Sequence, residues 1–142
     1  MQLWRPQGKG AKAPLILLKV TIRGEPDVPS FTTVFDYDEQ VFFSSAAIIE
    51  EKIQQKMKIN ANEALMTYCA YVAKSIRAGK KDTDIRKGTS EILSADNVMI
   101  GVPETLQTIT FEATLDNGVR KVTIKNPIST SNYMMTEHYE GK

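Results

Sequence analysis

The sequence predicts an α+β fold: a helical bundle of three to four helices followed by a C-terminal antiparallel β-hairpin, with a second hairpin near the N-terminus. Three observations predict it. Apolar side chains recur at helical spacing from residue 38 to about residue 100. Apolar and polar side chains alternate on both sides of Asn117-Gly118, a strong hairpin-turn signal. Two β-branched runs near the N-terminus flank a turn that contains prolines. With 142 residues, the chain can bury one core.

The N-terminal hairpin is expected within an extension that covers residues 1–36. Residues 15–22 are aliphatic and β-branched, which favours a strand, and residues 31–35 form a second short run. The prolines between the two runs favour a turn, so the runs should pair with each other. Residues 37–128 are expected to form the main domain, and residues 129–142 a polar tail without periodicity.

The first two helices follow from caps and apolar spacing. Asp38 is a candidate N-cap for the first helix. Asn60 or Asn62 opens the second helix, which Gly79 ends because glycine readily takes the left-handed conformation. One wide apolar face of the first helix is predicted to hold Val41, Phe42, Ala46, Ile49, Ile53 and Met57.

A third helix is expected from residue 82 to residue 92, with Asp82 as its cap. Ser94 then caps a short helical turn, which Gly101 and Pro103 end. The apolar stripes of all these helices are interpreted as core rather than as a cofactor site.

The C-terminal hairpin is the clearest local prediction. Its expected register pairs Asp116 with Val119 across the Asn117-Gly118 turn. That register places Phe111 opposite Ile124 and Ala113 opposite Val122 on the buried face, and Glu112 and Thr123 on the other face.

Composition excludes several classes of function. The 18 Lys and Arg nearly balance the 17 Asp and Glu, and this net charge of +1 argues against a general nucleic-acid binder. The longest strictly aliphatic run, residues 15–18, is far too short for a membrane span. One cysteine (Cys69) and one histidine (His138) are too few for a zinc, nickel or copper site. We therefore expect a cytoplasmic chain with no catalytic, cofactor-binding or metal-binding residue.

An ordered set of short segments runs from residue 37 to residue 128. The set resembles the gamma subunit of urease, and its order and spacing make the resemblance specific. Its segments are Ser45-Ala46-Ala47-Ile48, Met57-Lys58-Ile59-Asn60 with Glu63-Ala64, residues 93–104, residues 109–115 with Asn117-Gly118, and residues 122–128.

The resemblance implies a non-catalytic structural subunit of urease, the nickel-dependent amidohydrolase that converts urea to ammonia and carbamate or CO2. In that family the nickel ligands belong to the alpha subunit. The gamma subunit helps to build an (αβγ)3-type assembly with alpha and beta subunits, with no nucleic acid or membrane as partner. The family usually has His where Lys125 stands, and both ends of this chain extend beyond the family pattern.

The resemblance also suggests structural and interface residues. Gly101 and Pro103 are expected to set a turn, with Met99 and Val102 buried, and Asn126-Pro127-Ile128 to lie against a partner. The full set is Met99, Gly101, Val102, Pro103, Glu104, Phe111, Asn117, Gly118, Lys125, Asn126, Pro127 and Ile128.

Two other functions compete with this interpretation. One is a gamma-like paralogue that serves as an interaction module for another partner, which the change to Lys125 favours. The other is a winged-helix-like nucleic-acid-binding domain, because three helices followed by a hairpin have the right order. Asp82 and Asp84 at the start of its recognition helix argue against the second alternative.

Overall fold

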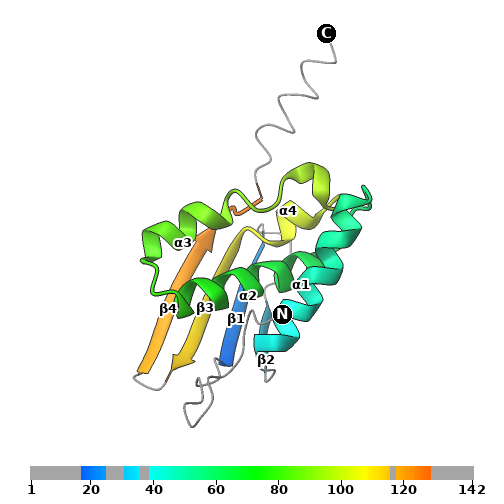
Figure 1. Cartoon of the computed structure of the whole chain (residues 1–142). Helices are drawn as coiled ribbons and strands as arrows, with labels where there is room; N and C mark the ends of the chain where they lie inside the picture. Colours follow the sequence, from blue (N-terminus) through cyan, green and yellow to red (C-terminus); the bar gives the residue numbers. More distant parts are fainter. Residues whose placement is uncertain (1–16, 25–30, 36–38, 116–117, 129–142) are drawn as a thin grey trace.

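The computed structural model describes residues 17–24, 31–35, 39–115 and 118–128 (Figure 1). The asparagine of the predicted turn, Asn117, lies outside these ranges. In chain order the elements are β1 (Leu17–Arg23), β2 (Phe31–Phe35), α1 (Glu39–Gln54), α2 (Ala61–Arg77), α3 (Asp82–Thr89), a 3-10 turn (Ala95–Asn97), α4 (Val102–Thr105), β3 (Thr108–Leu115) and β4 (Gly118–Lys125).

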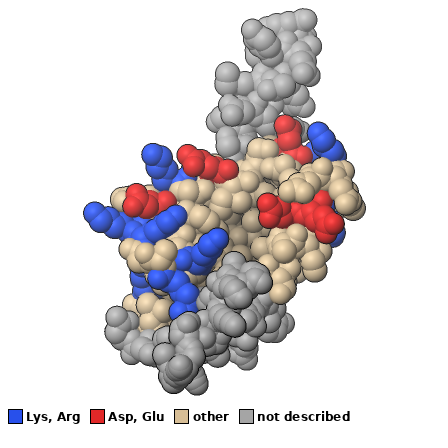
Figure 2. All heavy atoms as spheres, in the orientation of Figure 1, with Lys and Arg blue, Asp and Glu red and all other residues tan. Residues whose placement is uncertain are grey.

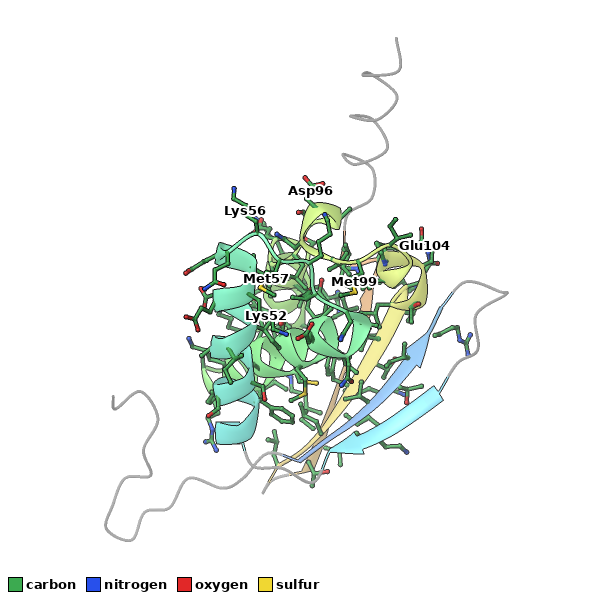
Figure 3. All side chains as sticks on the ribbon, turned by 90° about the vertical axis from the view of Figure 1, so that its right-hand side faces the viewer. Lys52, Lys56, Met57, Asp96, Met99 and Glu104 are labelled. Atoms are coloured by element: carbon green, nitrogen blue, oxygen red, sulfur yellow. The ribbon has the colours of Figure 1, made fainter. Side chains whose placement is uncertain are left out.

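The α+β fold predicted from the sequence is confirmed, and both expected hairpins are present. They do not form separate units. The strand order is β2-β1-β3-β4, with every neighbouring pair antiparallel, so β1 joins the N-terminal hairpin to the C-terminal one. In the described part of the chain the helices cover one face of this four-stranded sheet (Figures 1 and 3).

The core lies between the sheet and α2. Strand alternation points Val20 of β1 and Phe111 of β3 toward the helices, and both are fully buried. Helix α2 contributes Tyr68, Cys69 and Val72 at helical spacing, and these are buried as well. Burial of these large apolar side chains is the main favourable term in folding.

Helix α1 ends earlier than the apolar pattern suggested. It stops at Gln54, and Lys56 takes the left-handed conformation with φ of +65°. The amide of Lys56 then donates to the Ile53 carbonyl, and the amide of Met57 to the Lys52 carbonyl. This is the Schellman arrangement, which satisfies the last carbonyls of a helix. Met57 therefore lies outside the helix and is 48% exposed, so its predicted place on the buried face was wrong.

Capping residues explain where α2 begins and ends. The side chain of Asn60 accepts from the Glu63 amide, and the Glu63 carboxylate accepts from the Asn60 amide, a complete capping box. Gly79 follows the end of α2 with φ of +76°, as expected.

Asp82, by contrast, does not cap α3. It is the first residue of that helix, and its carboxylate accepts from Arg120 of β4 at 2.7 Å. Helix α3 also ends at Thr89 rather than at residue 92.

The predicted register of the C-terminal hairpin was wrong by two residues. Leu115 faces Gly118, and Phe111 faces Val122 rather than Ile124. A shift of two leaves every side chain on its predicted face, because strand side chains alternate with a period of two. The observed register sets Glu112 opposite Lys121 and lets the hydroxyls of Thr110 and Thr123 hydrogen-bond at 3.3 Å. These cross-strand pairs stabilise the hairpin better than the Glu112–Thr123 pairing.

Replacing Phe111 by Ala should lower the free energy of unfolding by about 3–5 kcal/mol, because a fully buried aromatic side chain is lost and a cavity remains. Thr114→Ala, at an exposed position of the same strand, should cost about 1 kcal/mol or less. Urea unfolding of the three proteins measures both values. Equal stability of the Phe111 variant and the wild type would contradict the observed burial.

Candidate functional site

Two loops distant in sequence form one backbone unit beside the end of α1. The Ile59 amide donates to the Asn97 carbonyl at 3.0 Å, and the Met99 amide donates to the Ile59 carbonyl at 2.9 Å. Ile59 and Val98 thereby form a parallel bridge, and both side chains are buried. The ammonium of Lys58 also donates to the Asp96 carbonyl at 2.8 Å. The loop after α1 and the loop after α3 are therefore held rigidly together.

This unit presents three exposed apolar side chains, named here the Met57–Ile100 patch: Met57, Met99 and Ile100. Their exposed fractions are 48%, 46% and 97%. Met57 and Met99 lie on the same side of the molecule (Figure 3). Met99 was expected to be buried, and that prediction was wrong. The bridge turns Val98 inward, so the next side chain in this extended stretch points outward.

Gly101 and Pro103 form a turn, as predicted, but the turn begins a helix rather than ending one. Gly101 has φ of +95° and stands immediately before α4, with Pro103 in the first turn of that helix. The Thr105 hydroxyl donates back to the Gly101 carbonyl at 2.9 Å. Val102 is buried, as expected, and Glu104 is exposed. The turn thus anchors the chain directly after Ile100.

The predicted chain exit divides into an exposed and a buried half. Lys125 and Asn126 are exposed, and Asn126 has φ of +48° with its amide bonded to the Gln107 carbonyl. Pro127 and Ile128 are buried within this chain. Of the other predicted residues, Phe111 lies in the core, and Gly118 is exposed at the start of β4. The structure therefore brings Met99 to Glu104 together but does not bring Phe111 or Gly118 to the same surface.

A groove that sequence reasoning missed lies between α1 and α2. It encloses about 950 Å³ and is lined mainly by apolar side chains, among them Phe43, Ala46, Ile53, Ala70 and Tyr71. Sequence spacing placed Ala46 and Ile53 on the core-facing stripe. Small alanines on both helices leave a hollow where larger side chains would fill the space. The sequence signal for this hollow was the presence of alanines at residues 46, 47 and 70 in the two amphipathic helices.

An ion pair ties α1 to α2 close to the patch. The Lys52 ammonium donates to the Glu63 carboxylate. This hydrogen bond, together with the one from the Asn60 amide, holds the pKa of the Glu63 carboxyl below its ordinary value. Both signs of charge occur on the helical face of the molecule (Figure 2). The Lys52–Glu63 ion pair therefore links α1 to α2, and the mixed charges around it do not create a large field of one sign.

The site carries no reactive cluster within the ranges that the structure describes. No three His, Cys, Asp or Glu side chains there are close enough to hold a metal ion. Cys69 is buried, and burial raises the pKa of its thiol, which disfavours the nucleophilic thiolate. His138 lies outside the described residues. None of the described helices is long and apolar enough to cross a membrane.

Exposed apolar side chains on a rigid turn, without a metal-binding cluster among the described residues, suit a protein that contacts other chains. The family described as "Urease, gamma subunit" matches residues 33–128. The urease subunit gamma of Halalkalibacterium halodurans is 36% identical over 91 residues, which are 63% of this chain and 91% of that protein. This chain belongs to the urease gamma-subunit family.

Acid should weaken the protein partly through Glu63. Because the pKa of this carboxyl is lowered in the folded state, its stabilising contribution is present above its ordinary value of 4.5 and disappears as the pH falls through the lowered pKa. Glu63→Gln should flatten this part of the stability profile. Lys52→Met should flatten it in part, because it removes the Lys52 hydrogen bond and leaves the one from the Asn60 amide. Denaturant unfolding at a series of acidic pH values measures both. Acid profiles identical to wild type in both variants would refute the coupling.

Gly101→Ala should destabilise the protein by about 1–2 kcal/mol. The added methyl group meets no atom within 4 Å, so the penalty comes from the positive φ alone. Gly101→Asn should lose less stability, since asparagine tolerates the left-handed region better than alanine does. Thermal or urea unfolding ranks the three proteins, and an alanine variant as stable as wild type would contradict the conformation.

Proposed function

We propose that this chain is the non-catalytic gamma subunit of a urease, acting in the cytoplasm. In this proposal it assembles with urease alpha and beta subunits in an (αβγ)3-type complex that hydrolyses urea to ammonia and carbamate. The nickel centre and its ligands belong to the alpha subunit, and this chain supplies no metal ligand and no cofactor site. Its contribution is to hold neighbouring chains in a fixed arrangement.

The Met57–Ile100 patch is the observation that supports this role most directly. Ile100 is apolar and 97% exposed, which is unfavourable in water. Its exposure stops costing free energy when another surface covers the side chain. The patch lies next to the Gly101 turn, inside the family match. A partner chain that covered these side chains would remove exposed apolar surface from water.

Rigidity is what such a subunit can add to catalysis elsewhere. An active site needs its groups held within about 0.5 Å of the productive geometry by the surrounding structure. The bridge between Ile59 and Val98 fixes the patch to α2 and the core, so a partner bound there meets a preformed surface. Binding to a preformed surface avoids the entropy of ordering a loop.

Ile100→Asp should weaken assembly with the alpha and beta subunits by about 10-fold or more, because central apolar contacts dominate binding energy. Ile48→Asp is the matched control, since Ile48 is also an exposed isoleucine at 60% but lies on α1 outside the patch. The chain is co-expressed, with an affinity tag, alongside urease alpha and beta subunits from its source organism. Recovered subunits are quantified by mass spectrometry and urea-dependent ammonia release by assay.

Reduced recovery with Ile100→Asp and normal recovery with Ile48→Asp would support the proposed interface. Equal recovery of the partner subunits with both variants would show that the Met57–Ile100 patch is not the interface. A wild-type chain that captures no amidohydrolase and yields no ammonia release would refute the urease role and favour the gamma-like interaction module, for which the exposed Lys125 is the specific observation.

A further inference from the structure

One of the two inner strands of the sheet, β1, comes from outside the family match. The match covers residues 33–128, whereas β1 spans Leu17–Arg23. Yet β1 lies between β2 and β3, and every one of its residues faces a residue of β3. The Halalkalibacterium halodurans relative is matched over 91% of its length by 91 residues, so only about nine of its residues remain unmatched. That remainder is shorter than the segment from β1 to β2.

The contact between β1 and the matched region is buried in the core. Leu18, Val20 and Ile22 point to the helices and are at most 1% exposed. They lie opposite Ala113, Phe111 and Ile109 of β3, all fully buried. The alternate residues Lys19 and Thr21 are exposed on the other face. Recognition therefore uses the backbone of β3 and one aliphatic face of β1.

Without β1, the matched region would present two open features side by side. One is the backbone N–H and C=O groups along the outer edge of β3, which readily accept another strand. The other is the apolar floor beside that edge, which includes the buried Ala113, Phe111 and Ile109 of β3. An unpaired edge beside an apolar floor is the arrangement that proteins use to bind an added strand.

We propose that the β3 edge and this floor are a strand-acceptor site, and that the N-terminal hairpin of this chain is its ligand. The site takes an antiparallel strand with aliphatic side chains at alternate positions, in the register that pairs Val20 with Phe111. The hairpin closes the site from within the chain, so the chain completes its sheet before it meets a partner. While β1 is in place, partner strands can add only at the outer edges, β2 and β4. This inference does not depend on the urease role.

The test separates the hairpin from the remainder of the chain after folding. A recognition sequence for a specific protease is placed at residues 36–38, between β2 and α1, and the purified full chain is cut. The cut chain should stay together as one particle of the uncut size. Its fragments are then separated in guanidinium chloride, and the larger fragment is refolded with or without a synthetic peptide of residues 15–36.

We expect cooperative unfolding and near-ultraviolet circular dichroism to return only with the peptide, bound one to one by native mass spectrometry. Two variant peptides test the register. Val20→Lys places a charge on the buried face and should bind at least about 10-fold more weakly, because an unpaired buried charge is strongly unfavourable. Thr21→Lys changes the neighbouring exposed position and should bind within about 3-fold of the natural peptide.

Three results would overturn the proposal. The large fragment could regain the same cooperative unfolding without peptide, which would show that the strand is not needed to complete the site. The natural peptide could fail to restore the fold. The two variant peptides could bind equally well, which would show that the edge does not select one face of the strand.

Discussion

The pairing of β1 with β3 is the interaction on which the rest of this structure depends. It turns two hairpins, each marginal in water as an isolated unit, into one four-stranded sheet. That sheet supplies the floor on which α2 packs through Tyr68, Cys69 and Val72. With α2 in place, the capping box at Asn60 fixes the loop that carries Ile59, and Ile59 in turn pairs with Val98. The position of the exposed patch thus follows, contact by contact, from a strand near the N-terminus.

Local signals predicted most of the elements, and tertiary contacts decided the remainder. Both hairpins, the α2 caps at Asn60 and Gly79 and the buried face of the C-terminal hairpin follow from nearest neighbours in sequence. The joining of β1 to β3 does not, because residues about 90 positions apart meet there and alternation alone names no partner. Asp82 satisfies the sequence rule for a cap but instead pairs with Arg120 of β4, a contact that only the folded chain creates.

The candidate site shows the same division. Gly101 and Pro103 predicted a turn at the right place, because both residues restrict the backbone in known ways. Met99 is exposed because of the bridge between Ile59 and Val98, which links two loops separated by two helices. The sequence does not reveal that bridge, so an apolar residue at this position was predicted to be buried. Pro127 and Ile128 were expected to meet a partner and are instead covered by this chain. The burial of a loop residue depends on contacts with residues distant in sequence, so the apolar periodicity of the sequence does not predict it.

The single thiol of the chain, Cys69, lies at the centre of the layer between α2 and the sheet, with no exposed surface. A reagent that modifies thiols can reach it only when α2 separates from the strands beneath it. Because the sequence contains no other cysteine, the modification rate reports that one opening event, without any introduced label. The modification rate of Cys69 therefore measures how often the core opens, both in the isolated chain and when other proteins are bound to it.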